Sequence, residues 1–264
     1  MSKTFVVGDI HGAHIALEQC LERSGFNNEE DTLIQLGDVV DGWSESFEAV
    51  EKLLTIKNLI AIRGNHDEWW RKYITEGEHV ERFKHGALST LKSYGFNILG
   101  KEWNKFQVVY DYKEDSLFTN LNIKDIPKKH VDFFNNQLNY YVDKNNNCFV
   151  HGGFNKYYPI NKQPDPYIYF WDRSLWYSMI DTTIGEPIKS KVFYGVDNFK
   201  NIFIGHTPTI NWDTDKPMNS DILYNIDTGA GFTGRLTIMD VETKDYWQSD
   251  PCPLIYPHEK GRNK

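Results

Sequence analysis

The sequence has 264 residues, of which 40% are hydrophobic, and its formal net charge at pH 7 is -8. This length suffices for one large α/β domain, and we expect a single domain over residues 1–264. The acidic balance disfavours steered binding to long nucleic acids or anionic membranes, so no stable nucleic-acid complex is expected.

Membrane and secretion signals are not evident in the sequence. No apolar run approaches the roughly 20 residues that span a bilayer, and no hydrophobic signal region follows Met1-Ser2-Lys3. The three cysteines, Cys20, Cys148 and Cys252, are odd in number and lack the close pairing of a zinc site. We therefore expect a cytoplasmic protein with reduced, structural cysteines and no membrane partner.

The first third of the chain alternates short apolar runs with helical patterns. Strands are expected at 5–7, 33–36 and 59–62, and helices at 13–24 and 46–57. Such alternation argues for parallel strands joined by crossover helices. Residues 68–94 are compatible with helix, and their histidines, His79 and His85, are expected to be ordinary solvated side chains.

The rest of the chain mixes strand and helix signals. Antiparallel strands are expected within 95–121, a helix at 127–138, and strands at 148–150, 201–204, 224–231 and 235–241. Between two of these strands lies an insertion at 154–180 that is rich in aromatic residues, with a short helix expected in its second half. The tail after Asp250 is expected to be loosely ordered.

Polar residues follow five of the predicted strands. They are Asp9 and His11, Asp38, Asn65, His151 and His206, each next to or close to a glycine. Each has an ordinary explanation when taken alone, since Gly37-Asp38 is a common turn and Asn65 can cap a helix. Together, five strand ends that carry carboxylate, imidazole or amide groups indicate one site for divalent cations.

The same stretches resemble a known family. Its motifs are Gly8-Asp9-Ile10-His11-Gly12, Gly37-Asp38-Val39-Val40-Asp41, Arg63-Gly64-Asn65-His66-Asp67, His151-Gly152-Gly153 and Gly205-His206-Thr207. In this order they resemble the calcineurin-like metallophosphoesterases, most of all the bacterial and phage branch of the PPP-type serine/threonine phosphatases, beside the symmetrical diadenosine tetraphosphatases. The resemblance implies an α/β fold, a sandwich of two mixed β-sheets flanked by helices (α/β/β/α).

The resemblance also implies a cofactor and its ligands. Two divalent metal ions are implied, manganese above all, with iron or zinc as alternatives. Asp9, His11 and Asp38 would hold the first ion, and Asp38, Asn65, His151 and His206 the second. A water molecule activated between two such ions attacks phosphorus in line. His66 would protonate the leaving oxygen while Asp41 orients its ring.

Two positions bear on substrate binding. Arg173 resembles the second phosphate-binding arginine of the family, although an arginine beside aromatic residues is often a cation–π surface residue. Asn65 is assigned to substrate as well as to metal. The family pattern breaks after Asp41, where the PPP-type phosphatases have Arg-Gly and this chain has Gly42-Trp43. One phosphate-binding arginine is therefore missing from its usual place.

Three functions remain open from the sequence. The leading one is a phosphomonoesterase that resembles the serine/threonine phosphatases, acting on a phosphoprotein, a nucleotide or a small phosphoester. The alternative is a hydrolase of nucleotides, dinucleoside polyphosphates or phosphodiesters, for which the aromatic residues of 154–180 would stack a base or else only pack an irregular loop. A catalytically silent metal-binding adaptor is the third, and it is disfavoured because all six ligands, His66 and Asp41 are present.

Overall fold

The computed structural model of the chain describes residues 2–77, 85–96, 110–111, 116–117, 123–180 and 199–263. No helix in these ranges combines the length and the apolar character that a membrane span requires. His79 and most of the region 95–121 lie outside the described residues. Within that region, β4 (Tyr110–Asp111) and β5 (Ser116–Leu117) pair antiparallel, as the sequence predicts.

The first sheet has five strands in the order β12-β11-β1-β2-β3. They are β1 (Thr4–Val7), β2 (Thr32–Gln35), β3 (Asn58–Ala61), β11 (Thr237–Asp240) and β12 (Tyr246–Gln248). The first three are parallel, and their register places Val6 beside Ile34 and Ile34 beside Ile60. The last two strands are antiparallel, β11 to β1 and β12 to β11. The predicted parallel arrangement with crossover helices is therefore confirmed for the first third of the chain.

The second sheet has the order β6-β7-β8-β10-β9. Its strands are β6 (Tyr140–Val142), β7 (Asn147–Val150), β8 (Asn201–Ile204), β9 (Met218–Ser220) and β10 (Leu223–Asn225). The three central strands are parallel, whereas β6 and β9 pair antiparallel at the two edges. Both sheets are thus mixed, and each contains three adjacent parallel strands, which lie at one side of the first sheet and at the centre of the second.

The two sheets face each other across a buried apolar layer. On β1, Val6 belongs to this layer, while Phe5 and Val7 belong to the core on the other face, because side chains alternate along a strand. From the second sheet, the rings of Phe149 and Phe203 stack in the layer with centroids 5.0 Å apart. The predicted α/β sandwich of two mixed sheets is confirmed.

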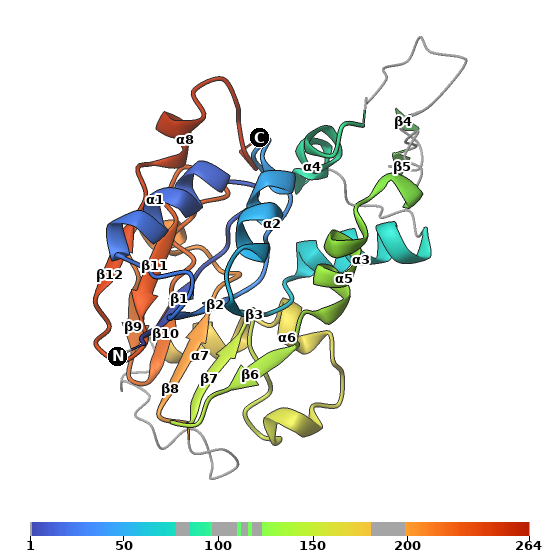
Figure 1. The fold of residues 1–264 in the computed structure, drawn as a ribbon. Coiled ribbons are helices and arrows are strands. Elements are labelled where there is room, and N and C mark those ends of the chain that lie inside the picture. The colour runs from blue at the N-terminus through green and yellow to red at the C-terminus, as the bar shows by residue number, and fades with distance from the viewer. Residues whose placement is uncertain are drawn as a thin grey trace.

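Helices cover the outer face of each sheet (Figure 1). Over the first sheet lie α1 (His14–Ser24), α2 (Ser46–Leu54), α3 (Asn65–Glu76), α4 (Ala87–Ser93), α5 (Lys128–Asn136) and the short α8 (Cys252–Ile255). Over the second lie α6 (Ile168–Trp171) and α7 (Ser174–Ile180), in the half of the insertion where a helix is expected. Three 3₁₀ turns complete the described part, η2 (Ile123–Asp125), η3 (Ile160–Lys162) and η6 (Thr209–Trp212).

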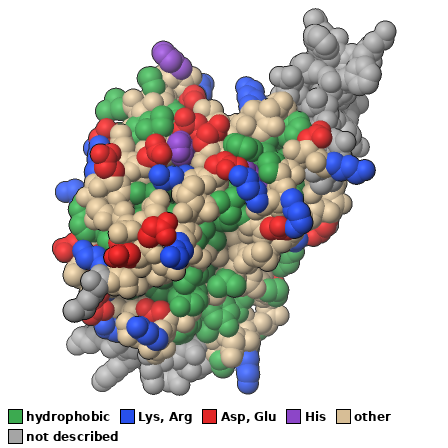
Figure 2. All heavy atoms as spheres, viewed as in Figure 1, with side chains coloured by type: hydrophobic (Ala, Val, Ile, Leu, Met, Phe, Trp, Pro, Cys, Tyr) green, Lys and Arg blue, Asp and Glu red, His purple; other side chains and the backbone are tan. Residues whose placement is uncertain are grey.

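The surface carries mixed charge on the face seen in Figure 2, where acidic and basic side chains are interspersed. The described residues on this face form no continuous basic area of the kind that follows a phosphate backbone.

The tail after Asp250 was expected to be loosely ordered, and this expectation is wrong. Cys252 is fully buried, and the ring of Tyr256 stacks on Trp43 with centroids 5.0 Å apart. The tail therefore packs on the core through an aromatic partner more than 200 positions earlier in the chain. A prediction from local composition has no access to such a partner.

Two neighbouring leucines of α2 test how the core contributes to stability. Leu53 is fully buried, whereas 38% of the surface of Leu54 is exposed. We expect Leu53→Ala to lower the free energy of unfolding by about 2–5 kcal/mol, because it leaves a cavity in the core. Leu54→Ala should change it by roughly 0.5 kcal/mol. Urea unfolding measures both values, and equal losses would contradict the packing described for this helix.

Candidate metal centre

The ends of five strands meet at one edge of the sandwich. Because β1, β2 and β3 are parallel, as are β7 and β8, each set carries its carboxyl ends to the same edge of its sheet. The residues just beyond these ends are Asp9 and His11, Asp38, Asn65, His151 and His206. All six side chains are buried. The fold therefore brings together all six of the ligands that the sequence predicts.

Two groups of three side chains have the spacing of a metal site, and Asp38 belongs to both. One group is Asp9, His11 and Asp38, and the other is Asp38, His151 and His206. Within each group the candidate ligand atoms lie within 4.8 Å of one another. Asn65 borders the second group, since its Oδ1 lies 3.2 Å from Nε2 of His151. The arrangement suits two cations that share one carboxylate.

Backbone carbonyls orient two of the histidine rings. Nδ1 of His11 lies 2.8 Å from the carbonyl oxygen of Asp41, and Nδ1 of His151 lies 2.8 Å from that of Leu36. A ring that donates from Nδ1 keeps the lone pair of Nε2 for a metal ion. Nε2 of both rings points toward Asp38, at 3.7 Å from Oδ2 for His11 and 3.4 Å for His151.

An unpaired nitrogen supports the fit of a cation. Nε2 of His206 is buried and has no hydrogen-bond partner among the residues that the structure describes. A buried polar atom without a partner is costly, and a metal ion satisfies it. Imidazole nitrogens with carboxylate and amide oxygens suit manganese, iron or zinc. The donor set thus fits the divalent ions that the resemblance implies.

The electrostatics of the site favour positive charge. Burial, with the neighbouring carboxylates Asp227 and Asp38, raises the pKa of Asp9 well above its usual value. Burial also opposes ionisation of Asp38, but His151 and His66 outweigh it and hold the pKa of that carboxyl well below its usual value. For His151 burial is outweighed by Asp38 and Asp9, which raise its pKa to about 9. The carboxylates therefore create a negative potential that attracts cations.

The backbone at this edge is unusual. Eight non-glycine residues of the described part have a positive φ, and half of them are His11, Asp38, Asp41 and His206. A left-handed conformation costs such a residue of order 1–3 kcal/mol and persists only where the surrounding structure imposes it. The concentration of these conformations at the strand ends is typical of a functional site.

His66 and Asp41 form a pair beside the metal group. Nδ1 of His66 lies 2.8 Å from Oδ2 of Asp41, and Oγ1 of Thr90 donates to the other carboxylate oxygen at 2.7 Å. The rings of His66 and His11 meet edge to face with centroids 5.1 Å apart. Burial raises the pKa of Asp41 to about 7 and, with the charge of Arg262, lowers the pKa of His66. The pair is buried, is hydrogen-bonded to Thr90 and is adjacent to the candidate ligands.

Arg173 also lies at the site. Its Nη1 donates to the carbonyl oxygen of His206 at 2.6 Å and to Oγ1 of Thr207 at 2.8 Å. These bonds fix the guanidinium beside a candidate metal ligand. Arg173 thus contacts one candidate metal ligand, as Asn65 contacts another, and the role of both residues in substrate binding remains a prediction.

Several residues at the site were not identified from the sequence. Trp69 packs on His66 with ring centroids 4.8 Å apart and on Trp171 at 5.1 Å, and Trp171 in turn meets His206 at 5.8 Å. Trp69 follows His66 by three positions in α3, a spacing that places both on one helix face and was available in the sequence. Thr90 carried no such signal, because it lies 49 residues from Asp41.

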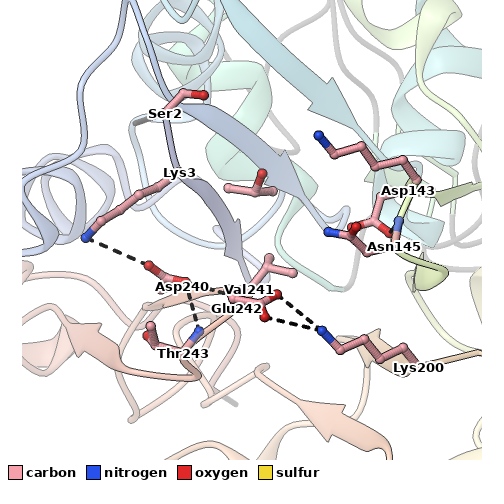
Figure 3. A pocket seen from close by; sticks show the side chains of 11 residues that line it. Ser2, Lys3, Asp143, Asn145, Lys200, Asp240, Val241, Glu242 and Thr243 are labelled. Atoms are coloured by element: carbon pink, nitrogen blue, oxygen red, sulfur yellow. Dashed lines mark hydrogen bonds and ion pairs between the residues drawn. The ribbon is translucent and has the colours of Figure 1, made fainter.

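A separate cavity of about 650 Å³ lies at the opposite ends of the strands (Figure 3). It is lined near the start of β1 by Lys3, and its wall also contains Lys200, Asp240 and Glu242. Lys3 pairs with Asp240 at 3.9 Å, and Lys200 pairs with Glu242 at 3.3 Å. The cavity is therefore a solvated ionic surface remote from the metal group.

Comparisons with known sequences agree with this geometry. The model of the calcineurin-like phosphoesterase family matches residues 2–225. The asymmetrical bis(5'-nucleosyl)-tetraphosphatase PrpE of Oceanobacillus iheyensis is 25% identical in an alignment of 261 positions, which covers 92% of this chain and 90% of that protein. The symmetrical enzyme of Buchnera aphidicola is 38% identical over 65 residues, 24% of each chain. This chain thus spans about a quarter of the length of that symmetrical relative.

Solved structures share the fold at low sequence identity. A candidate diadenosine tetraphosphatase aligns with a TM-score of 0.61 and 18% identity, over 95% of this chain and 93% of the other. A serine/threonine phosphatase of Saccharomyces cerevisiae aligns with a TM-score of 0.54 and 13% identity, over 94% and 80%. The match to the family model includes every strand end that carries a candidate ligand, and the chain belongs to the calcineurin-like phosphoesterase family.

Proposed function

We propose that this protein is a phosphoesterase that requires two divalent cations and hydrolyses phosphate monoesters. The observation that carries the proposal is the position of Asp38, whose carboxylate belongs to both groups of candidate ligands. A shared carboxylate holds two cations close together, as in-line displacement at phosphorus requires. Membership of the family supports the same chemistry.

The proposed cations are manganese, with iron or zinc as alternatives. Asp9, His11 and Asp38 would hold one, and Asp38, Asn65, His151 and His206 the other. When bound, two such ions neutralise phosphoryl oxygens and lower the pKa of a water molecule, which then attacks phosphorus. The carbonyl oxygens of Asp41 and Leu36 would keep the rings of His11 and His151 in the ligating tautomer.

We assign the general acid to His66. Asp41 fixes the ring through Nδ1, so Nε2 is left to deliver a proton to the leaving oxygen. Thr90 holds Asp41 in turn and has a positioning role. An anionic substrate beside the ring favours its doubly protonated form, which is the form that can donate.

Arg173 and Asn65 are proposed to bind the substrate phosphate. The guanidinium of Arg173 is fixed beside His206 by two hydrogen bonds, and a charged planar donor suits a phosphate oxygen pair. The amide of Asn65 lies within reach of the second group of ligands.

A second candidate function is hydrolysis of a dinucleoside polyphosphate. Two observations favour it: the tetraphosphatase name of the PrpE relative, and the Trp69–Trp171 pair beside His66 and His206. Stacking of a nucleobase on an exposed aromatic ring stabilises a complex by about 1–3 kcal/mol. Of the surface of Trp171, 36% is exposed. The remaining aromatic residues of the insertion divide between the core, as with Trp176, and the surface, as with Tyr157.

One assay separates the candidates. Turnover of an aryl phosphate monoester, an aryl phosphodiester and diadenosine tetraphosphate is measured with and without manganese. Monoester turnover supports the leading proposal, and turnover of the dinucleotide alone supports the second. Manganese binding without any turnover would instead indicate a silent adaptor.

The three buried free cysteines support a cytoplasmic location, which we also propose.

Asp38→Asn tests the shared carboxylate. We expect manganese-dependent turnover to fall by roughly 10³-fold or more, because the contribution of both cations, several kcal/mol, is lost. Asp31→Asn is the matched control, since Asp31 is a buried carboxylate that precedes β2 whereas Asp38 follows it. Metal content and kcat/KM are measured for both. Full metal content with near-normal turnover in Asp38→Asn would refute the two-cation model.

His66→Asn separates acid catalysis from metal binding. Manganese content should be unchanged while turnover of an alkyl phosphate falls by roughly 10² to 10⁴. The loss should be smaller for nitrophenyl phosphate, whose leaving group hardly needs a proton. His14→Asn, on the surface of α1, serves as the control. Equal losses on both substrates would remove the acid assignment from His66.

Gly205→Ala tests whether the close approach of the backbone to Asp9, a candidate metal ligand, matters for metal binding. A Cβ atom at this position would lie 2.1 Å from Oδ1 of Asp9 and would force that carboxylate away. We expect Gly205→Ala to weaken manganese binding by about tenfold or more. Gly25→Ala is the control because its Cβ meets open space, and its positive φ costs only about 1 kcal/mol of stability. Titration with manganese gives both affinities, and equal affinities would show that Asp9 is not a ligand.

A further inference from the structure

The break in the family pattern at Gly42-Trp43 has a counterpart in the C-terminal segment. Trp43 is fully buried, stacks on Tyr256, and donates from Nε1 to the carbonyl oxygen of Ala230 at 2.7 Å. Ser44 binds Glu259 through its hydroxyl at 2.6 Å and its amide at 3.0 Å. The stretch that follows Asp41 therefore serves as the docking surface for the end of the described chain.

This docking carries the chain from α8 back toward α2 and the site (Figure 1). The amide of Arg262 donates to the carbonyl oxygen of Gly231 at 2.8 Å. The side-chain stem of Arg262 then passes beside Gly42: its Cγ lies 3.5 Å from where a Cβ of residue 42 would be. The arginine of the tail thus occupies the space next to the position where the family arginine is missing.

An arginine could not simply be restored at position 42. Gly42 has a φ of +149°, which disfavours any other residue, and an added Cβ would lie 2.8 Å from the carbonyl oxygen of His11. The backbone there follows a course that suits glycine and leaves room for the incoming stem.

The guanidinium of Arg262 reaches the candidate metal centre. Its Nη1 lies 3.0 Å from Nε2 of His11, and its Cζ lies 4.8 Å from the ring centroid of Phe232. The Nε atom is buried and has no hydrogen-bond partner within the described ranges. The bond to His11 is the one side-chain hydrogen bond that Arg262 makes to a described residue.

We infer that Arg262 is a substrate-binding residue, whose guanidinium supplies from the C-terminal segment the phosphate contact that Gly42 cannot. The inference rests on the proposed function. A purely structural arginine would have its donors satisfied by carbonyl or carboxylate oxygens, whereas this one has an unpaired buried Nε and donates to the nitrogen that His11 would use for a cation. The remaining N–H groups of this guanidinium, beside the candidate metal ligands, suit a phosphate dianion, whose oxygens accept two parallel N–H bonds.

The test measures binding of orthophosphate to the manganese-loaded protein by calorimetry, beside its manganese content and melting curve. We expect Arg262→Gln to weaken orthophosphate binding by roughly tenfold to a hundredfold, with manganese content unchanged. Lys260→Gln is the matched control, because it removes the same charge from an exposed side chain two positions earlier. It should shift the affinity by less than about twofold, as expected of an exposed, screened charge.

Arg262→Lys provides a second variant that keeps the stem and the charge but loses the planar fork. We expect an intermediate loss of roughly threefold to tenfold, and this variant decides the question if Arg262→Gln does not fold. Orthophosphate affinity equal to that of Lys260→Gln overturns the inference. So does a variant that only binds manganese more tightly, since Arg262 would then merely compete for His11.

The failure of this inference is distinguishable from failure of the proposed function. If the unchanged protein hydrolyses phosphoesters while Arg262→Gln binds orthophosphate normally, only the role of Arg262 is wrong. If the unchanged protein neither binds orthophosphate nor hydrolyses any ester with manganese present, both are wrong.

Discussion

The sharing of Asp38 between two groups of ligands is the constraint on which the rest of the structure depends. Its Oδ1 accepts the backbone N–H of His66 at 2.9 Å, and its backbone is left-handed, with a φ of +55°. Residues from the other sheet, His151 and His206, reach the same carboxylate. The sandwich brings those side chains together because the parallel strands of both sheets end at one edge.

Gathering buried carboxylates and imidazoles costs stability unless positive charge compensates them. Within this cluster the pKa of Asp9 and that of His151 are raised, whereas the pKa of Asp38 is lowered. The apolar layer between the sheets and the helix-covered cores offset the cost, and they hold the strained strand ends in place. The packed cores therefore support a site whose buried charges are unfavourable by themselves, and bound cations would compensate those charges.

Much of the fold was predictable because it depends on local pattern. Short, mainly apolar runs such as residues 33–36, set between amphipathic stretches, indicate buried parallel strands with crossover helices. The structure has the first three of these strands within one residue of the prediction, whereas α2 ends three residues before the predicted position 57. Periodicity does not reveal which strands from distant parts of the chain become neighbours. That β11 joins β1, and that Tyr256 covers Trp43, depends on packing between residues far apart in the sequence.

The candidate ligands were likewise determined by the sequence, since each lies at a strand end within a short motif whose residue types suit a cation. The tertiary structure alone decided what surrounds them. Thr90 reaches Asp41 from α4, and Arg262 reaches His11 across 251 positions. Such contacts have no local signature, because a hydrogen bond between distant segments depends on where the chain returns in space. The sequence therefore indicated which side chains could bind a cation, and the fold decided which distant side chains contact them.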